Sequence, residues 1–147
     1  MIHIQTEDFD MAHEYQALRN DNHNDGAIVT FTGLVRDVSV NLPLQQLTLE
    51  HYPGMTEKSL TEIVSQAKQR WPLGNVRLIH RVGSLNSHEQ IVFVGVTSKH
   101  RQAAFQACEF IMDFLKNQAP FWKKETTEQG EQWVDAKQTD QQALSRW

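Results

Sequence analysis

The segment from Ser98 to Glu125 constrains the fold more than any other part of the 147-residue chain. Apolar residues recur at helical spacing between Ala104 and Leu115, so the pattern predicts one long helix over residues 99–118 with a buried face. Pro120 cannot continue a helix and therefore ends it. The run Phe-Trp-Lys-Lys-Glu that follows is expected to be a strand.

The start of this helix carries cations for which folding alone gives little reason. Ser98 is predicted to be the N-cap, which places Lys99, His100 and Arg101 in the first turn. Acidic side chains are usual there, because the unpaired amides and the helix dipole already supply positive charge. A breach of this local rule is expected where a binding site sets the residues, and a helix N-terminus with His and Arg suits a phosphate.

The end of the helix carries a second group of cations. Lys116 lies in the last turn, and Lys123 and Lys124 lie on the expected strand beside Phe121 and Trp122. Apolar walls lower the pKa of an amine, which favours a reactive site. Spacing alone leaves two alternatives open, a solvated face and a set of structural ion pairs. We interpret the whole element as the wall of one anion-holding pocket.

Patterns elsewhere predict a single α+β domain over residues 1–147, with a mainly antiparallel sheet and two long packed helices. The strand at residues 89–97 is apolar on both faces, so it should lie centrally in its sheet. A hairpin at residues 86–88 should join it to the preceding strand, and Asp37–Pro43 is expected to be a loop. Strands are expected at residues 3–5, 26–36, 44–52, 76–85, 89–97, 121–127 and 132–136, and helices at 6–19, 60–71 and 99–118, with a helical turn or docked tail at 140–147.

Composition excludes several classes of function. A formal net charge of -4 argues against nucleic acid as a partner, because nucleic acid requires a broad basic face. The N-terminus has no signal-peptide pattern and the longest apolar run, Ile91–Val96, cannot span a bilayer, so we expect a cytoplasmic protein without membrane contact. No two histidines are three or four residues apart, and no nucleotide-binding glycine motif occurs, so neither a metal nor a cofactor is expected.

Several residues with reactive side chains are better explained by packing. Cys108, the only cysteine, lies in the middle of the apolar stripe of the long helix, where a thiolate is not favoured. His51 and His80 lie on strand faces shared with leucine and valine, which is typical of partly buried structural histidines. Arg36 follows a strand at the mouth of a loop, and by itself it reads as a solvated surface residue.

The chain from about Gly26 to Trp147 resembles the large, catalytic subunit of molybdopterin synthase. Five stretches carry the resemblance in the same order: Gly-Ala-Ile-Val-Thr-Phe-Thr-Gly-Leu-Val-Arg, Leu-Glu-His-Tyr-Pro-Gly-Met-Thr-Glu-Lys, Val-Gly-Val-Thr-Ser-Lys-His-Arg, Phe-Ile-Met-Asp-Phe-Leu-Lys and Ala-Pro-Phe-Trp-Lys-Lys-Glu. The resemblance implies an α+β fold with a hammerhead-like subdomain. It also implies a sulfurtransferase that converts cyclic pyranopterin monophosphate into molybdopterin.

The resemblance further implies partners. The sulfur would arrive as a thiocarboxylate on the C-terminal Gly-Gly of a small ubiquitin-like subunit, whose tail enters the large subunit. A homodimer of large subunits would form the core of a heterotetramer.

Site residues follow from the matching motifs. Lys116 and Lys123 match the lysines regarded as catalytic. The positions that match substrate-binding residues are Leu34, Val35, Arg36, His100, Arg101, Lys124 and Glu125. Leu34 stands where the family often has lysine, so we expect a changed pocket rim. Two alternatives remain: a non-catalytic module that binds a ubiquitin-like tail or a phosphorylated ligand, and a sulfurtransferase that uses Cys108.

Overall fold

The computed structural model describes residues 1–36, 46–134 and 138–147; the loop expected at Asp37–Pro43 lies outside them. The elements are β1 (Ile2–Gln5), α1 (Met11–Arg19), β2 (Ala27–Leu34), β3 (Gln46–His51), α2 (Met55–Arg70), β4 (Leu73–Arg81), β5 (Gly83–Leu85), β6 (Gln90–Ser98), α3 (Arg101–Gln118), β7 (Phe121–Thr127), β8 (Gly130–Val134), α4 (Gln138–Ala143) and a 3₁₀ helix (Leu144–Arg146).

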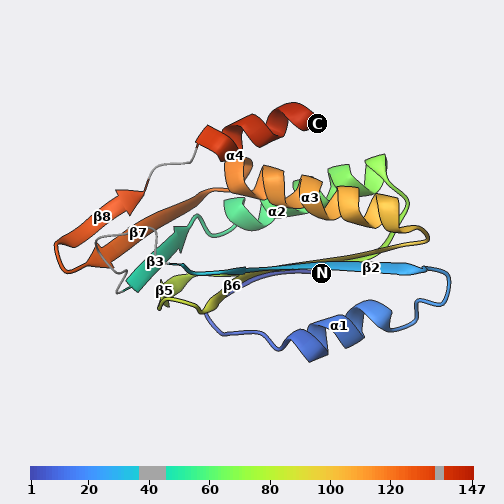
Figure 1. Ribbon diagram of the computed structural model, residues 1–147, viewed down its shortest axis with the longest axis horizontal. Coiled ribbons are helices and arrows are strands. Elements are labelled where there is room, and N and C mark those ends of the chain that lie inside the picture. Colours follow the sequence, from blue (N-terminus) through green and yellow to red (C-terminus); the bar gives the residue numbers. More distant parts are fainter. Residues whose placement is uncertain (37–45, 135–137) are drawn as a thin grey trace.

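The described strands form two four-stranded sheets. The first sheet has the order β1-β4-β6-β2, and only its β1–β4 pair is parallel. The second sheet, β5-β3-β7-β8, is antiparallel throughout. In Figure 1, α2 and α3 cover one face of the first sheet and α1 lies on the other. The fold is therefore α+β with mainly antiparallel sheets, as the sequence predicts.

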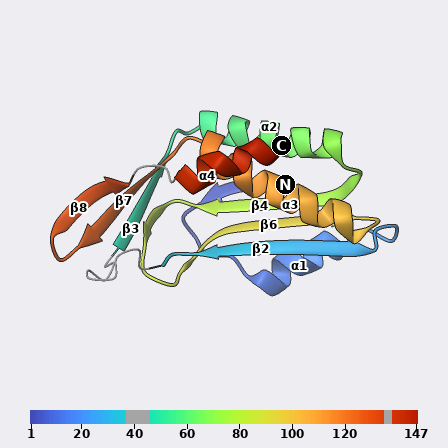
Figure 2. The same cartoon turned by 45° about the horizontal axis from the view of Figure 1, so that its top comes forward.

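The central place of β6 follows from its side chains. Val92, Val94 and Val96 point into the core beneath α2 and α3, while Phe93 packs on the opposite side with residues of α1. A strand that buries both faces needs neighbours on both edges and helices above and below. Figure 2 shows β6 between β4 and β2, which confirms the prediction.

The long helix begins two residues later than the capping pattern predicts. His100, not Ser98, is the N-cap of α3. Ser98 instead ends β6, and its buried hydroxyl donates a hydrogen bond of 2.8 Å to the carbonyl of Pro72. The tertiary contact competes successfully for the hydroxyl that would have capped the helix. Lys99 therefore lies outside the helix, and only Arg101 of the three cations is in its first turn.

The strand expected at residues 76–85 is divided between the two sheets. β4 ends at Arg81, and β5 begins at Gly83, whose φ of +88° turns the chain in a way that favours glycine. β5 then pairs with β3 and not with β6, so residues 86–88 do not form the simple hairpin that the sequence suggested. The division brings the end of β4 to the junction of the two sheets.

The C-terminal segment folds back onto α3, as a docked helical tail. The ring of Trp147 packs edge-on against Trp71 and Phe110. Its indole donates to Asp113 at 2.7 Å, and Arg146 pairs with the same carboxylate. These contacts hold α4 beside the end of α3 (Figure 2). Within the part of the chain that the structure describes, no helix is long and apolar enough to cross a membrane.

Candidate functional site

A cavity of about 140 Å³, the lysine cavity, lies where the two sheets meet the end of α3. It receives side chains from seven described strands and helices. Its lining residues are Leu49, His80, Ile91, Val92, Leu115, Lys116, Ala119, Phe121, Lys123, Val134 and Asp140. Most of the lining is apolar, so the two ammonium groups and one carboxylate lie in a largely hydrophobic recess.

Local structure explains why the two lysines meet. α3 ends with Ala119 as its C-cap, and Pro120 directs the chain into β7. The hydroxyl of Thr56 on α2 donates to the carbonyl of Pro120 at 3.0 Å and fixes this reversal. Lys123 then lies on the strand face that points back to the last turn of α3, where Lys116 lies. The sequence prediction that a helix end and the next strand form one cationic wall is consistent with this geometry.

The lysine cavity also contains a buried histidine. The pKa of His80 is lowered to about 4, mainly by burial and in smaller part by the positive charges of Lys123 and Lys116. The ring of His80 and the side chains of Lys116 and Lys123 therefore line the same space.

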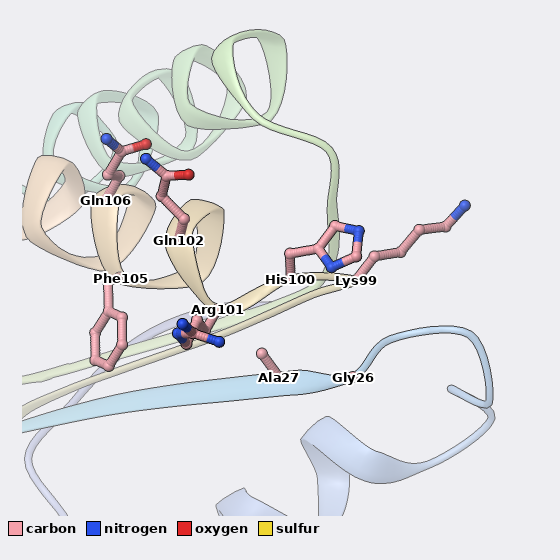
Figure 3. A pocket seen from close by; sticks show the side chains of 8 residues that line it. All are labelled: Gly26, Ala27, Lys99, His100, Arg101, Gln102, Phe105 and Gln106. Atoms are coloured by element: carbon pink, nitrogen blue, oxygen red, sulfur yellow. The ribbon is translucent and has the colours of Figure 1, made fainter.

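A second and larger pocket, the Arg101 pocket, lies at the other end of α3. Its volume is about 740 Å³, and it is lined by Gly26, Ala27, Lys99, His100, Arg101, Gln102, Phe105 and Gln106. Figure 3 shows Arg101 and Phe105 pointing from α3 toward β2, while Lys99 extends away. The first turn contains no acidic residue, and no side chain caps it. Its amide N–H groups and Arg101 together suit an anion.

The two sites are far apart within one chain. Arg101 and Lys116 are separated by fifteen residues of one helix, which spans about 22 Å at 1.5 Å per residue. The sequence analysis assigned these residues to a single pocket. That expectation is wrong for an isolated chain, because a straight helix cannot bring its own two ends together.

The residues at the end of β2 lie on the side of the lysine cavity. β2 runs away from the Arg101 pocket, and its eight residues span roughly 23 Å between Ala27 and Leu34. Val35 is buried in a cluster with Leu49, which itself lines the lysine cavity. Leu34 is 53% exposed and Arg36 is exposed. Within one chain, Arg36 is therefore not beside His100 and Arg101.

The two remaining predicted site residues lie on opposite faces of β7. Lys124 forms an ion pair with Glu131 at 3.5 Å, and its ammonium lies 5.7 Å from the centre of the Trp133 ring. It therefore faces away from Lys123. Glu125 alternates back to the face of Lys123 and is partly buried. Neither residue lines the two pockets described above, and their roles in binding stay predictions.

Sequence reasoning missed two residues of the lysine cavity. His80 was assigned to packing because it lies in an apolar strand, and only the turn at Gly83 brings that strand's end to the cavity. Asp140 reaches the cavity only because the C-terminal segment folds back. The sequence offered no signal for either residue, because the burial of His80 beside Arg81 is seen only in the folded chain.

Cys108 is a core residue, as its position in the helix predicts. It is 5% exposed, and burial raises the pKa of its thiol to about 12. A thiol with this pKa is neutral at physiological pH and is a poor nucleophile. Among the described residues, no three side chains of His, Cys, Asp or Glu gather as a metal site would require.

The fold and its two sites define a class: an α+β protein with cationic side chains in pockets at both ends of one long helix. Residues 4–118 match the family model described as MoaE protein, and the chain belongs to this family. It is 56% identical over 146 residues to the molybdopterin synthase catalytic subunit of Vibrio cholerae, covering 99% of this chain and 97% of that protein.

Two further matches agree with this assignment. The molybdopterin synthase catalytic subunit of Escherichia coli (strain K12) is 56% identical over 139 residues, which cover 95% of this chain and 92% of that protein. The solved structure titled molybdopterin biosynthesis MoaE protein from Burkholderia ambifaria superposes with a TM-score of 0.86 at 52% identity, covering 100% of this chain and 97% of that one.

Proposed function

We propose that this chain is the catalytic subunit of a molybdopterin synthase, a sulfurtransferase that builds the dithiolene of molybdopterin on cyclic pyranopterin monophosphate. Its high identity to proteins named molybdopterin synthase catalytic subunit supports this function over nearly the full chain. The observation that carries the mechanism is the meeting of Lys116 and Lys123 in one apolar-walled cavity. Residues 1–147 act as one domain in the cytoplasm, and the second sheet is the hammerhead-like subdomain.

The lysine cavity accepts the sulfur donor. Pockets for small organic ligands usually measure about 300–1,000 Å³, so a cavity of about 140 Å³ is too small for a whole pterin. It suits a narrow, extended group such as a C-terminal Gly-Gly thiocarboxylate. The term catalytic subunit in the names of the relatives supports a second subunit as partner, and in this proposal that subunit carries the sulfur.

The two lysines divide the chemistry in this proposal. Once the thiocarboxylate sulfur has bonded to the pterin, water adds to the acyl carbon, and the resulting tetrahedral oxyanion collapses to a carboxylate as the C–S bond breaks. Lys116 stabilises this oxyanion, because an ammonium in an apolar site interacts strongly with developing negative charge. Lys123 assists proton transfer as the cyclic phosphate opens. Neither step uses Cys108, in agreement with its burial and raised pKa.

The Arg101 pocket holds the phosphate and pterin of the substrate. Its volume of about 740 Å³ is within the range for a small organic ligand. Arg101 and the free amides at the start of α3 supply charge-assisted donors. His100 lies at the N-cap and contributes a further ring nitrogen to the same rim.

A homodimer joins the two sites. β2 is an edge strand of the first sheet, and exposed apolar side chains accompany it, with Phe31 40% and Phe105 60% exposed. Two copies of β2 paired antiparallel about a two-fold axis would set the start of one strand beside the end of the other. Arg101 of one protomer would then approach Arg36 and the lysine cavity of its partner. The exposed Leu34 would lie on the rim of this shared site.

The test is reconstitution with purified components. The chain is mixed with a small subunit that carries a C-terminal thiocarboxylate and with cyclic pyranopterin monophosphate, and the dithiolene product is measured. We expect turnover that depends on all three components. A non-catalytic binding module would retain the pterin unchanged, and this outcome would overturn the proposal.

A further inference from the structure

One buried side chain of the lysine cavity has no part in the scheme above. His80 lies near the end of β4 and is 5% exposed. Its ring stacks on that of Phe121, with centroids 3.9 Å apart and planes inclined by 19°. Phe121 is two residues from Lys123 on the same face of β7. The imidazole is therefore held rigidly against the strand that carries one of the two lysines.

A backbone contact fixes which ring nitrogen of His80 carries the proton. Nδ1 lies 2.8 Å from the carbonyl oxygen of Arg81. A carbonyl oxygen only accepts hydrogen bonds, so Nδ1 must be the protonated nitrogen of the neutral ring. Nε2 consequently carries a lone pair and acts as an acceptor.

The lone pair of Nε2 is the acceptor that His80 can offer to the lysine cavity. Nε2 bonds to no other residue in the part of the chain that the structure describes. The space that His80 lines is the lysine cavity, and Nε2 is the ring nitrogen that the carbonyl of Arg81 leaves available to it.

The surroundings restrict what Nε2 can bind. An unprotonated nitrogen repels an anion, so it cannot hold a carboxylate or a phosphate. The other described lining side chains are apolar, apart from Asp140, Lys116 and Lys123. Asp140 is an acceptor when ionised, so among the described residues the two ammonium groups are the only side-chain donors that line the cavity.

We propose that His80 is a positioning residue for sulfur transfer: its Nε2 accepts a hydrogen bond from a lysine ammonium of the cavity and fixes the direction of that amine toward the reacting group. The inference rests on the function proposed above. Such a bond restricts the long, flexible lysine side chain to one geometry, which matters because small misplacements of a catalytic group are costly.

The charge state of the ring suits this role. Burial, Lys123 on β7, Lys116 on α3 and His51 on β3 all lower the pKa of His80, which is about 4. The imidazole therefore stays neutral at physiological pH and adds no third positive charge beside the lysines. Asp140 on α4 is the acidic residue that lines the same space.

Two variants separate the acceptor from the packing. His80→Phe keeps an aromatic ring against Phe121 but cannot accept a hydrogen bond. His80→Gln loses the stack but keeps an amide oxygen near the place of Nε2. We expect kcat to fall about 10- to 100-fold in His80→Phe with little change in KM for the pterin, and to recover in part in His80→Gln. Full kcat in His80→Phe would overturn the inference, as would an equal loss in both variants.

The pH profile adds a readout that packing would not change. A hydrogen bond to a neutral acceptor favours the charged form of an amine, so its loss lowers the pKa of the lysine. The alkaline limb of kcat should therefore move to lower pH in His80→Phe. Phe9→Leu is the control, because it disturbs the Phe9–Phe93 pair on the other face of the first sheet. It should leave the limb in place.

A measurement on the unaltered histidine applies even if His80→Phe fails to fold. In protein labelled with ¹⁵N-histidine, Nε2 of His80 should resonate as an unprotonated nitrogen between about pH 6 and 8. Its shift should change in Lys116→Ala or in Lys123→Ala; no change in either would overturn the inference. The wild-type chain is assayed in parallel. If the proposed function has failed, the wild-type chain gives no dithiolene; if only the inference about His80 has failed, wild-type turnover is normal.

Discussion

The two ends of α3 hold cations in opposite ways. At the C-terminal end, Lys116 and Lys123 lie in a small recess walled by two sheets and by the returning C-terminal segment. At the N-terminal end, Arg101 lies in a larger and more open pocket between α3 and β2. An enclosed ammonium interacts strongly with developing charge, whereas an open guanidinium and helix terminus suit reversible capture of an anion. We therefore assign the chemistry to the lysine cavity and the binding of the substrate's anionic group to the Arg101 pocket.

This separation explains why one chain needs a second copy. Chemistry and binding are about 22 Å apart along the helix, a distance that no side chain bridges. The edge strand β2 spans about the same distance. Two-fold pairing of β2 from two copies would therefore bring the start of the strand in one protomer beside the end of the strand in its partner. Variants at Lys116 and Arg101, alone and mixed, test whether the two ends of α3 have these separate roles, and a variant at Cys108 tests the middle of the helix.

The largest effect should follow from Lys116→Ala. Removal of a single group that stabilises an oxyanion typically lowers kcat about 10²- to 10³-fold, and the small cavity offers no water-filled substitute for the amine. The rate of dithiolene formation measures the effect, and co-elution with the small subunit controls for assembly. Turnover near the wild-type rate would show that Lys116 is not catalytic. The lysine cavity would then not be the site of the chemistry.

A smaller effect of a different kind is expected from Arg101→Ala. A hydrogen bond to a charged group contributes about 1.5–3 kcal/mol, or roughly 10- to 100-fold in affinity. KM for the pterin should rise by this factor while the folded state is unaffected, because Arg101 is exposed. A steady-state titration with substrate measures the change. Arg19→Ala is the matched control, since this exposed arginine ends α1 on the other face of the first sheet (Figure 1).

Mixing the two variants tests the link between the ends. If Lys116 and Arg101 of one site come from different protomers, a mixed dimer contains one intact site. At pterin concentrations well below the KM of the Arg101→Ala variant, random exchange of subunits should then restore roughly a quarter of wild-type activity, since half the dimers are mixed and half their sites are intact. If both residues act within one chain, mixing restores nothing. Activity that stays at the level of the separate variants would thus contradict the shared site.

The sequence predicted the elements better than their connections. The apolar pattern of α3, the central position of β6 and the strand nature of β7 follow from periodicity, because each depends on residues close in the chain. The division at Gly83 and the N-cap at His100 depend on partners far away, namely β3 and the carbonyl of Pro72. Local propensity cannot weigh such contacts.

The candidate site shows the same limit. The pairing of a helix-end lysine with one on the next strand was predictable, since Pro120 forces an immediate reversal. The distance between Arg101 and Lys116 could also have been calculated from helix geometry, and the expectation of a single pocket ignored it. His80 and Asp140 could not have been assigned, because their approach depends on how both sheets and the C-terminus assemble.

The smallest effect should come from Cys108, which lies on α3 between the two ends. Cys108→Ala removes one buried sulfur and should lower the free energy of unfolding by about 1 kcal/mol, the usual size for such a change. Dithiolene formation should continue at nearly the wild-type rate. Burial keeps the pKa of the thiol about 12, so iodoacetamide at neutral pH should also leave the folded enzyme active. An inactive variant that is still folded would instead make Cys108 the sulfur carrier. The reacting group would then lie in the middle of α3 and not in the lysine cavity at its C-terminal end.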